Sequence, residues 1–89
     1  MDQNDLIDAK ILELIAQCGA DKTISPSDVA RALAGNDEKK WRLLMKPIRA
    51  RAILLADNQE LAIRRKGKLA DPQNFKGVYR LGSKPLDTQ

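Results

Sequence analysis

A proline interrupts the longest helical pattern of the chain. Apolar residues follow one helical stripe between residues 41 and 55, and Pro47 falls in the middle of that stripe. Proline inside a helix removes a hydrogen bond and clashes with the preceding turn, which costs about 3 kcal/mol. It also disfavours the helical conformation at the residue before it, Lys46. The sequence therefore predicts a short helix over roughly residues 37–45, a break, and a second helix with Pro47 at its first position. A single kinked helix is the alternative.

The N-terminal segment predicts a helix over residues 4–18. Asn4 or Asp5 can cap its start, acidic side chains occupy its first turn, and Gly19 is a suitable stop. One face of this helix collects apolar side chains at helical spacing, so it is expected to be buried. The members of that face are Ile7, Ile11, Leu14, Ile15 and Cys18.

The next segment, "KTISPSDVARALAG", begins with a short β-branched stretch at residues 22–24, which predicts an edge strand. Ser25 and Pro26 then form a strong helix start, and Asp28 stands at the right spacing for a capping box. Gly35 marks the end of this short helix.

The C-terminal half changes from helical to alternating patterns. The stretches "ELAIRR" and "VYRL" alternate as strands do, and "KGKLADPQNFKG" between them holds two glycines and a proline. We therefore expect two strands joined by a long basic loop with a protruding tip. Residues 1–82 are expected to form a single domain and residues 83–89 a loose tail.

The predicted order of helix, strand, helix, helix and strand–loop–strand is that of a winged-helix domain. The segments "ILELIAQCGADKTISPSDVARAL", "WRLLMKPIRARAILLADNQELAIRRKGK" and "DPQNFKGVYRL" resemble a family of small bacterial winged-helix proteins without an assigned function. The resemblance covers about residues 5–82. Its most distinctive positions lie in the wing, at Gly67, Asp71, Pro72, Gly77, Tyr79 and Arg80.

This resemblance implies an α+β fold of the winged helix-turn-helix type. Such a fold has three to four helices and a small antiparallel sheet that ends in a basic β-hairpin wing. As a class, winged helices usually bind DNA through the third helix and the wing, and a minority bind proteins instead. The class leaves the choice open, so the function has to be argued from the site itself.

Positive charge is confined to one part of the chain. Residues 37–80 carry twelve Lys and Arg against five Asp and Glu, a net charge of +7, whereas residues 1–36 carry a net charge of −3. Such a division indicates a polyanion as partner. A solvated basic surface that only keeps the protein soluble is the alternative.

Duplex DNA is the polyanion that this pattern favours, bound mainly through its phosphates. The candidate DNA-binding residues of the wing are Arg64, Arg65, Lys66, Lys68, Lys76 and Arg80, and those of the third helix are Lys46, Arg49 and Arg51. A basic loop of this kind can lay its charged groups along phosphates. Arg49 and Arg51 flank the buried stripe about 160° apart at helical spacing, so the two cannot enter one groove.

The outer face of the third helix supports a different hypothesis. Ala50, Ile53 and Leu54 make this face mostly apolar, which is poor for reading base edges. The same face suits a homodimer or a protein partner. Among the aromatic residues, Trp41 is expected in the core, whereas Phe75 either covers the core or stands exposed as a contact.

Several classes of function are excluded by residue types. The chain has no histidine and one cysteine, so it cannot form a Cys–His zinc site, a catalytic His pair or an internal disulfide. We therefore expect no enzyme, no metal and no cofactor. The longest apolar run, residues 52–56, is too short to span a bilayer, and the acidic start lacks the features of a signal peptide. A cytoplasmic location without membrane contact is expected.

Overall fold

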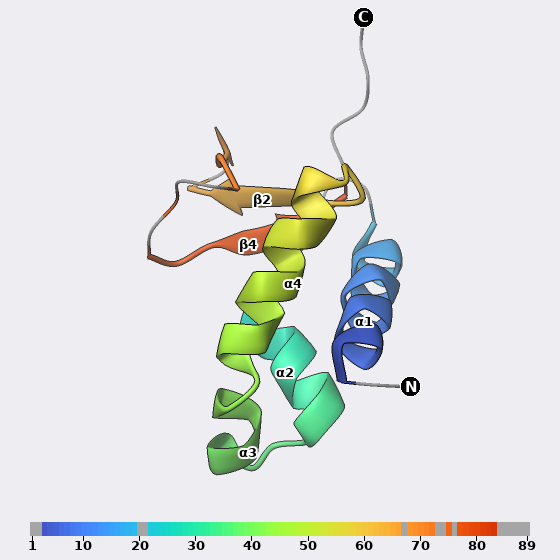
Figure 1. Ribbon diagram of the computed structural model, residues 1–89, viewed down its shortest axis with the longest axis vertical. Helices are drawn as coiled ribbons and strands as arrows, with labels where there is room; N and C mark the ends of the chain where they lie inside the picture. Colours follow the sequence, from blue (N-terminus) through green and yellow to red (C-terminus); the bar gives the residue numbers. More distant parts are fainter. Residues whose placement is uncertain (1–2, 20–21, 67, 73–74, 76, 84–89) are drawn as a thin grey trace, which may run out of the picture.

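The computed structural model describes residues 3–19, 22–66, 68–72, 75 and 77–83. Within these residues the chain forms four helices and a four-stranded antiparallel sheet, with the sheet and the short helix α3 at opposite ends of the long axis (Figure 1). This α+β arrangement confirms the predicted fold class and is compatible with a winged helix. The elements are α1 (Gln3–Cys18), β1 (Thr23–Ile24), α2 (Pro26–Ala34), α3 (Glu38–Arg42), α4 (Met45–Asp57), β2 (Ala62–Arg65), β3 (Lys68–Leu69) and β4 (Arg80–Gly82).

The start of α1 differs from the prediction, whereas its end agrees with it. The helix already includes Gln3, so Asn4 and Asp5 lie inside its first turn instead of capping it. At the other end, Gly19 has a φ of +96° and donates its N–H to the carbonyl oxygen of Ile15 at 3.3 Å. This left-handed conformation is one that glycine adopts without steric cost, which explains why the helix ends here.

Helix α2 begins as the sequence predicted. The Ser25 hydroxyl accepts the backbone N–H of Asp28, and the Asp28 carboxylate accepts the backbone N–H of Ser25 at 3.1 Å. Pro26 is the first helical residue, and Gly35 follows the last one. The capping box forms because all of its hydrogen bonds lie within four consecutive residues.

The break between α3 and α4 is also confirmed, but Pro47 is the third residue of α4 and not the first. Lys46 lies in the helix, contrary to the expectation that the proline would exclude it. The first N–H groups of any helix lack an intrahelical partner, so a proline within the first turn removes no hydrogen bond. In agreement, Ile48, directly after the proline, donates its N–H to the carbonyl oxygen of Leu44 at 2.9 Å.

The sheet contains a strand that the sequence pattern missed. Its strand order is β1–β4–β2–β3, with β1 at one edge as predicted. The segment expected to be a loop turns back at once after Lys66, and β3 pairs with β2 so that Arg65 lies opposite Lys68 and Arg64 opposite Leu69. The first part of the wing, β2 and β3, is therefore a hairpin. A two-residue strand with both side chains exposed carries no alternating pattern by which it could be recognised.

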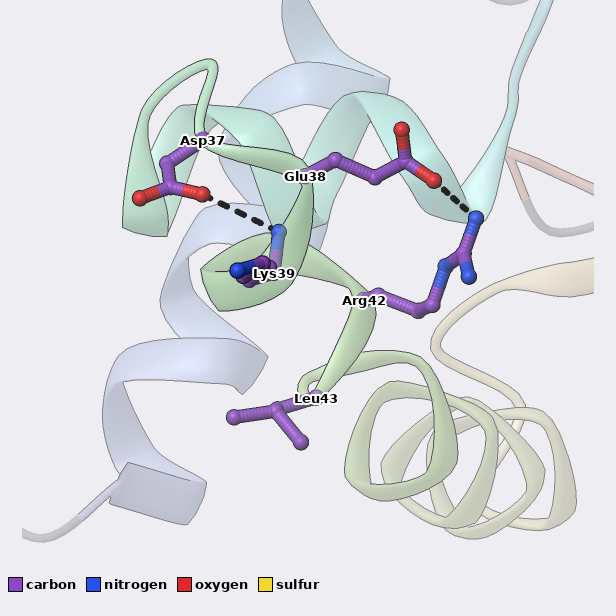
Figure 2. Close-up of a pocket in the computed structure, with 5 residues that line it drawn as sticks. All are labelled: Asp37, Glu38, Lys39, Arg42 and Leu43. Atoms are coloured by element: carbon purple, nitrogen blue, oxygen red, sulfur yellow. Dashed lines mark hydrogen bonds and ion pairs between the residues drawn. The ribbon is translucent and has the colours of Figure 1, made fainter.

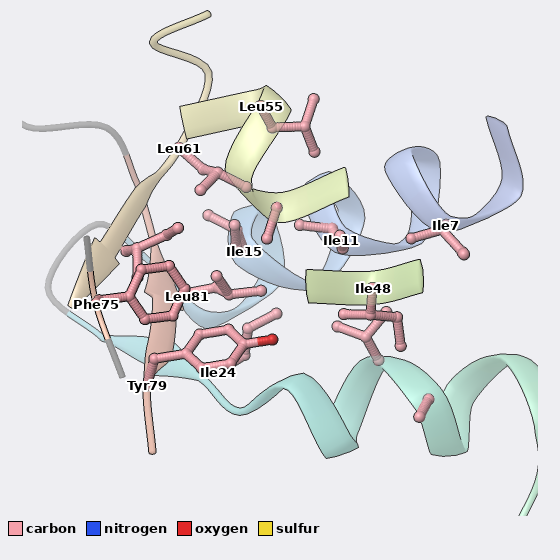
Figure 3. Close-up of a cluster of buried hydrophobic side chains, with 14 residues drawn as sticks. Ile7, Ile11, Ile15, Ile24, Ile48, Leu55, Leu61, Phe75, Tyr79 and Leu81 are labelled. Carbon is pink, nitrogen blue, oxygen red and sulfur yellow. The ribbon is translucent and has the colours of Figure 1, made fainter. Parts of the chain in front are cut away.

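One cluster of buried side chains joins the helices to the sheet (Figure 3). Phe75 folds back into this cluster, which settles the alternative left open by the sequence. Trp41, expected in the core, is only partly buried and packs against the cluster from outside, where the Arg31 guanidinium lies 5.0 Å from the centre of its ring. The cluster contains Ile7, Ile11, Ile15, Ile24, Val29, Ala30, Ile48, Ala52, Leu55, Leu61, Ile63, Phe75, Tyr79 and Leu81.

The position of Pro47 yields a stability prediction. Pro47→Ala should change the free energy of unfolding by less than about 1 kcal/mol, because no hydrogen bond is lost at this position and only the entropy of the unfolded chain changes. Ala50→Pro, one turn further into α4, should destabilise the protein by about 3 kcal/mol. Urea unfolding measures both variants. A Pro47→Ala variant stabilised by as much as 3 kcal/mol would show that the proline strains the helix.

Candidate nucleic-acid interface

The tip of the wing presents two lysines to solvent. Lys66 and Lys68 lie on either side of the turn between β2 and β3, and both side chains are exposed. Lys66 has a φ of +53°, a left-handed conformation that costs a residue with a side chain about 1 kcal/mol. None of the hydrogen bonds or ion pairs between described residues uses either ammonium group.

Arg65 connects the hairpin to the chain segment that leads into β4. Its Nε donates to the carbonyl oxygen of Val78 at 3.1 Å, and its Nη2 lies 3.2 Å from the place where a Cβ on Gly77 would stand. Gly77 has a φ of +83°, so a side chain at this position would be both strained and crowded. Because the carbonyl acceptor is neutral, Arg65 contributes its full positive charge to this surface.

Arg64 and Arg80 lie directly opposite each other on the neighbouring strands β2 and β4. Arg80 donates from Nε to the Thr23 hydroxyl at 2.6 Å and from Nη2 to the Thr23 carbonyl oxygen at 3.0 Å. Arg64 is half-buried, and no hydrogen bond or ion pair between described residues involves its guanidinium. Lys76, the remaining wing candidate, lies outside the described residues.

Arg49 points from α4 toward the sheet and packs on aromatic rings. Its guanidinium lies 4.1 Å from the centre of the Phe75 ring and 5.7 Å from that of Tyr79, and its Nη2 donates to the Phe75 carbonyl oxygen at 2.9 Å. Both the cation–π contact and the hydrogen bond hold the segment before β4 against α4. Arg49 thus packs the segment before β4 against α4. Its position in the sequence does not predict this role.

The two rings beneath Arg49 meet edge to face, with centres 5.1 Å apart (Figure 3). The Tyr79 hydroxyl is buried and has no hydrogen-bond partner among the described residues. Burial raises the pKa of Tyr79 above its ordinary value of 10.0, because the phenolate would lose its hydration, and the positive charge of Arg49 offsets a smaller part of this shift.

Arg51 lies on the opposite flank of α4 and faces α1. It forms a bidentate ion pair with Asp8, in which Nε lies 2.9 Å from Oδ1 and Nη2 lies 2.7 Å from Oδ2. The pair is half-buried and joins the two helices. Arg49 and Arg51 therefore lie on opposite flanks, in agreement with their predicted separation of about 160° at helical spacing, and both make contacts within the molecule.

The outer face of α4 offers few groups that could read base edges. Lys46, Ala50, Leu54 and Asp57 are exposed at helical spacing, and Leu54 keeps 46% of its surface accessible. Ile53, predicted on the same face, is half-buried and packs against the core. Base edges are recognised by directed hydrogen bonds, which alanine and leucine cannot make.

A shallow groove of about 390 Å³ separates the start of α2 from the segment before β4. Val78, with 85% of its surface exposed, borders this groove. Its remaining lining residues are Ser25, Pro26, Ser27, Met45, Gly77, Tyr79 and Arg80. The groove places the first turn of α2 beside the base of the wing on one surface.

A second depression, of about 760 Å³, lies at α3, far from the wing (Figures 1 and 2). The carboxylate of Asp37 accepts the backbone N–H of Lys39 at 3.0 Å, and Glu38 pairs with Arg42 one turn later. Both acids are thus engaged by their own helix, and the neighbouring Leu43 is exposed. This arrangement is that of a capped helix start, without a pair of carboxylates arranged for acid–base catalysis.

The part of the chain that the structure describes lacks two further types of feature. No group of three or more Cys, Asp or Glu side chains within it is arranged to hold a metal ion. None of its helices combines the length and the apolar composition needed to cross a membrane.

A protein-family model matches most of the chain. Residues 4–84 match a family whose description is "Protein of unknown function (DUF3253)". This range contains every residue of the wing and of α4 discussed above. No curated protein matches the chain.

The buried hydroxyl of Tyr79 leads to a prediction about pH. Its pKa is raised in the folded state, so folding favours the protonated form. This contribution to stability is complete below pH 10 and is lost as the pH rises through the folded pKa. Tyr79→Phe should therefore lose less stability than the native protein above pH 10. Below that pH it should be about 1 kcal/mol more stable, because no unpartnered hydroxyl remains buried.

Tyr79 is the only tyrosine of the chain, so the ultraviolet absorbance of tyrosinate reports its ionisation directly. Urea unfolding of both proteins across the alkaline range supplies the stabilities. Titration of the folded protein at the ordinary tyrosine pKa would contradict the prediction.

Proposed function

The chain belongs to the DUF3253 family of proteins of unknown function, and we propose that it associates with duplex DNA through the phosphates, using its basic wing. The observation that carries this proposal is the state of the wing's positive charges. The ion pairs between described residues engage Lys10, Arg42 and Arg51, and none of them involves a lysine or arginine of the wing. Wing charges without acidic partners are available to neutralise a polyanion.

The wing groups suit phosphate contacts in two ways. Lys66 and Lys68 are exposed at the hairpin tip, and a lysine is a point charge on a flexible stem that follows a phosphate backbone without strict geometry. Arg64, Arg65 and Arg80 extend from the strands at the base of the wing, where the sheet fixes their directions. We call this set of five basic side chains the wing strip.

The composition of α4 predicts that the protein discriminates only modestly between DNA sequences. Its outer face exposes Ala50 and Leu54 between Lys46 and Asp57, so it offers few hydrogen-bonding groups to base edges. Lys46 can add one phosphate contact at the start of the helix. Arg49 and Arg51 are left out of the proposed interface, because the contacts with Phe75 and Asp8 engage them.

We further propose that the protein is a non-enzymatic, transcription-related DNA-binding protein that acts in the bacterial cytoplasm without a metal or cofactor. Binding through phosphates requires no reacting group, and the residue types exclude histidine chemistry altogether. Modest preference among sequences would suit a protein that covers DNA or assists a more specific partner.

A second candidate function rests on the exposed apolar side chains of α4. The side chains of Ala50 and Leu54 are exposed to solvent, and that of Ile53 is only partly buried. Exposed apolar surface on a helix is typical of contact with a second copy or another protein. The two functions are compatible, since a dimer through α4 would carry two wings.

DNA binding is tested by fluorescence anisotropy with random duplex DNA at several salt concentrations. Four to six phosphate contacts predict that log affinity falls with log salt at a slope of roughly −4 to −5. The double variant Lys66→Asn/Lys68→Gln should flatten the slope by about 2, because each phosphate contact contributes about 0.9. Asparagine is chosen at position 66 because it tolerates the left-handed backbone there.

The matched control is Lys39→Gln/Lys40→Gln, which removes the same charge from exposed positions on α3, at the end of the molecule away from the sheet (Figure 1). It should leave the slope close to the native value. Absence of duplex binding by the native protein at low salt would refute the proposal. Equal effects of the two double variants would show that net charge, and not the wing, governs binding.

The second candidate function predicts a concentration-dependent dimer in sedimentation equilibrium. Leu54→Lys should shift this equilibrium toward the monomer, because it places a charge in an apolar contact. Lys46→Gln, about two turns away on the same exposed face of the helix, serves as the surface control. A native protein that stays monomeric at high concentration removes the homodimer and leaves only a foreign protein partner.

A further inference from the structure

The outer face of the sheet carries two arginines side by side. Ile63 and Leu81 lie opposite each other on β2 and β4 and are 1% and 0% exposed, so they define the inner face that covers the core. Side chains alternate between the two faces of a strand. The next pair along these strands, Arg64 and Arg80, therefore projects from the outer face.

Arg80 is held in one direction by the edge strand β1. Two of its nitrogens donate to Thr23, one to the hydroxyl at 2.6 Å and one to the carbonyl oxygen at 3.0 Å. Since Thr23 pairs with Gly82, the Arg80 side chain runs diagonally across the sheet toward the end of β4. These two bonds fix the guanidinium before any ligand arrives and leave part of its donors unused.

The Arg64 side chain also extends toward Thr23 and Gly82. Its Nε lies 3.9 Å from the position that a Cβ on Gly82 would occupy, and the Thr23 methyl group lies 3.1 Å from that position. Both guanidinium groups therefore border the small area formed by Thr23 and Gly82. A residue larger than glycine at position 82 would push the threonine or the nearby backbone away, so glycine keeps this area open.

The positive charges of Arg64 and Arg80 repel each other, and no acidic side chain in the described part of the protein compensates this repulsion. Like charges directly opposite each other on neighbouring strands are destabilising. No carboxylate among the described residues pairs with Arg64 or Arg80. An oxyanion placed between the two groups would remove the repulsion and accept paired hydrogen bonds from the planar guanidinium groups, the geometry that arginine offers to phosphate.

We propose that Arg64 and Arg80 form an oxyanion site on the outer face of the sheet, whose ligand is a single phosphate group. The inference deepens the proposed function and rests on it for the source of the phosphate, which is the backbone of duplex DNA. The lysines of the hairpin tip supply charge that follows the backbone loosely. The arginine pair fixes one phosphate at a defined place and so sets the register of the protein on the duplex.

The site is tested with inorganic phosphate, titrated into the full chain at constant ionic strength with chloride as the compensating ion. The Nε–H signals of the arginines are followed by NMR. Those of Arg64 and Arg80 should shift together and saturate, and phosphate should raise the melting temperature above its value in chloride. Arg64→Gln should weaken phosphate binding at least about fivefold, because it removes charge-assisted hydrogen bonds.

Arg64→Gln is a suitable variant because no hydrogen bond between described residues depends on this side chain. Arg42→Gln on α3 removes the same charge elsewhere and should leave phosphate binding unchanged. The inference is overturned if the Arg64 and Arg80 signals do not saturate with phosphate. It is also overturned if Arg64→Gln binds phosphate as the native protein does.

Duplex titrations with the same proteins separate this inference from the proposed function. Duplex binding without a saturable phosphate site would overturn the arginine pair and leave the function of the wing lysines standing. A saturable phosphate site without duplex binding would support the arginine pair and refute DNA as the source of its phosphate. Saturable phosphate binding together with duplex binding that Arg64→Gln weakens would support both.

Discussion

The packing of Arg49 on Phe75 and Tyr79 is the contact on which the placement of the wing depends. The two rings belong to the segment before β4, and the arginine belongs to α4, so the contact joins the helical part of the molecule to the sheet. A hydrogen bond to the Phe75 carbonyl oxygen adds direction to the cation–π attraction. With these rings buried, β4 is held beside β2, and Arg64 and Arg80 are brought opposite each other.

The arginines of α4 and those of the wing strip differ in their contacts. Arg49 and Arg51 act within the molecule, the first toward the sheet and the second toward Asp8 on α1. The ion pairs between described residues leave out the basic side chains of the wing strip. A guanidinium suits both tasks, because it stacks on rings and pairs with carboxylates as readily as with phosphate.

Local signals in the sequence correctly predicted the ends of helices wherever the stabilising contacts lie within a few residues of each other. The capping box at Ser25 and Asp28 and the glycine ends of α1 and α2 formed as predicted, and the predicted break is present, although α4 begins two residues before Pro47. The predictions failed where the signal was ambiguous or too short. Asn4 and Asp5 are good caps that the structure places inside α1, and β3 consists of two exposed residues. Pro47 was expected at the first position of α4 and lies at the third, where its missing N–H likewise removes no intrahelical hydrogen bond.

The sequence by itself determined the fold class, the order of the main elements and the concentration of basic residues in the wing. Those features depend on periodicity, capping and composition, which are properties of neighbouring residues. The tertiary structure alone decided what each arginine does. Arg49 and Arg65 look alike in the sequence, yet the first rests on aromatic rings and the second spans the base of the wing. Their partners, Phe75 and Val78, lie many residues away along the chain, and only the folded backbone determines which side chains meet across such distances.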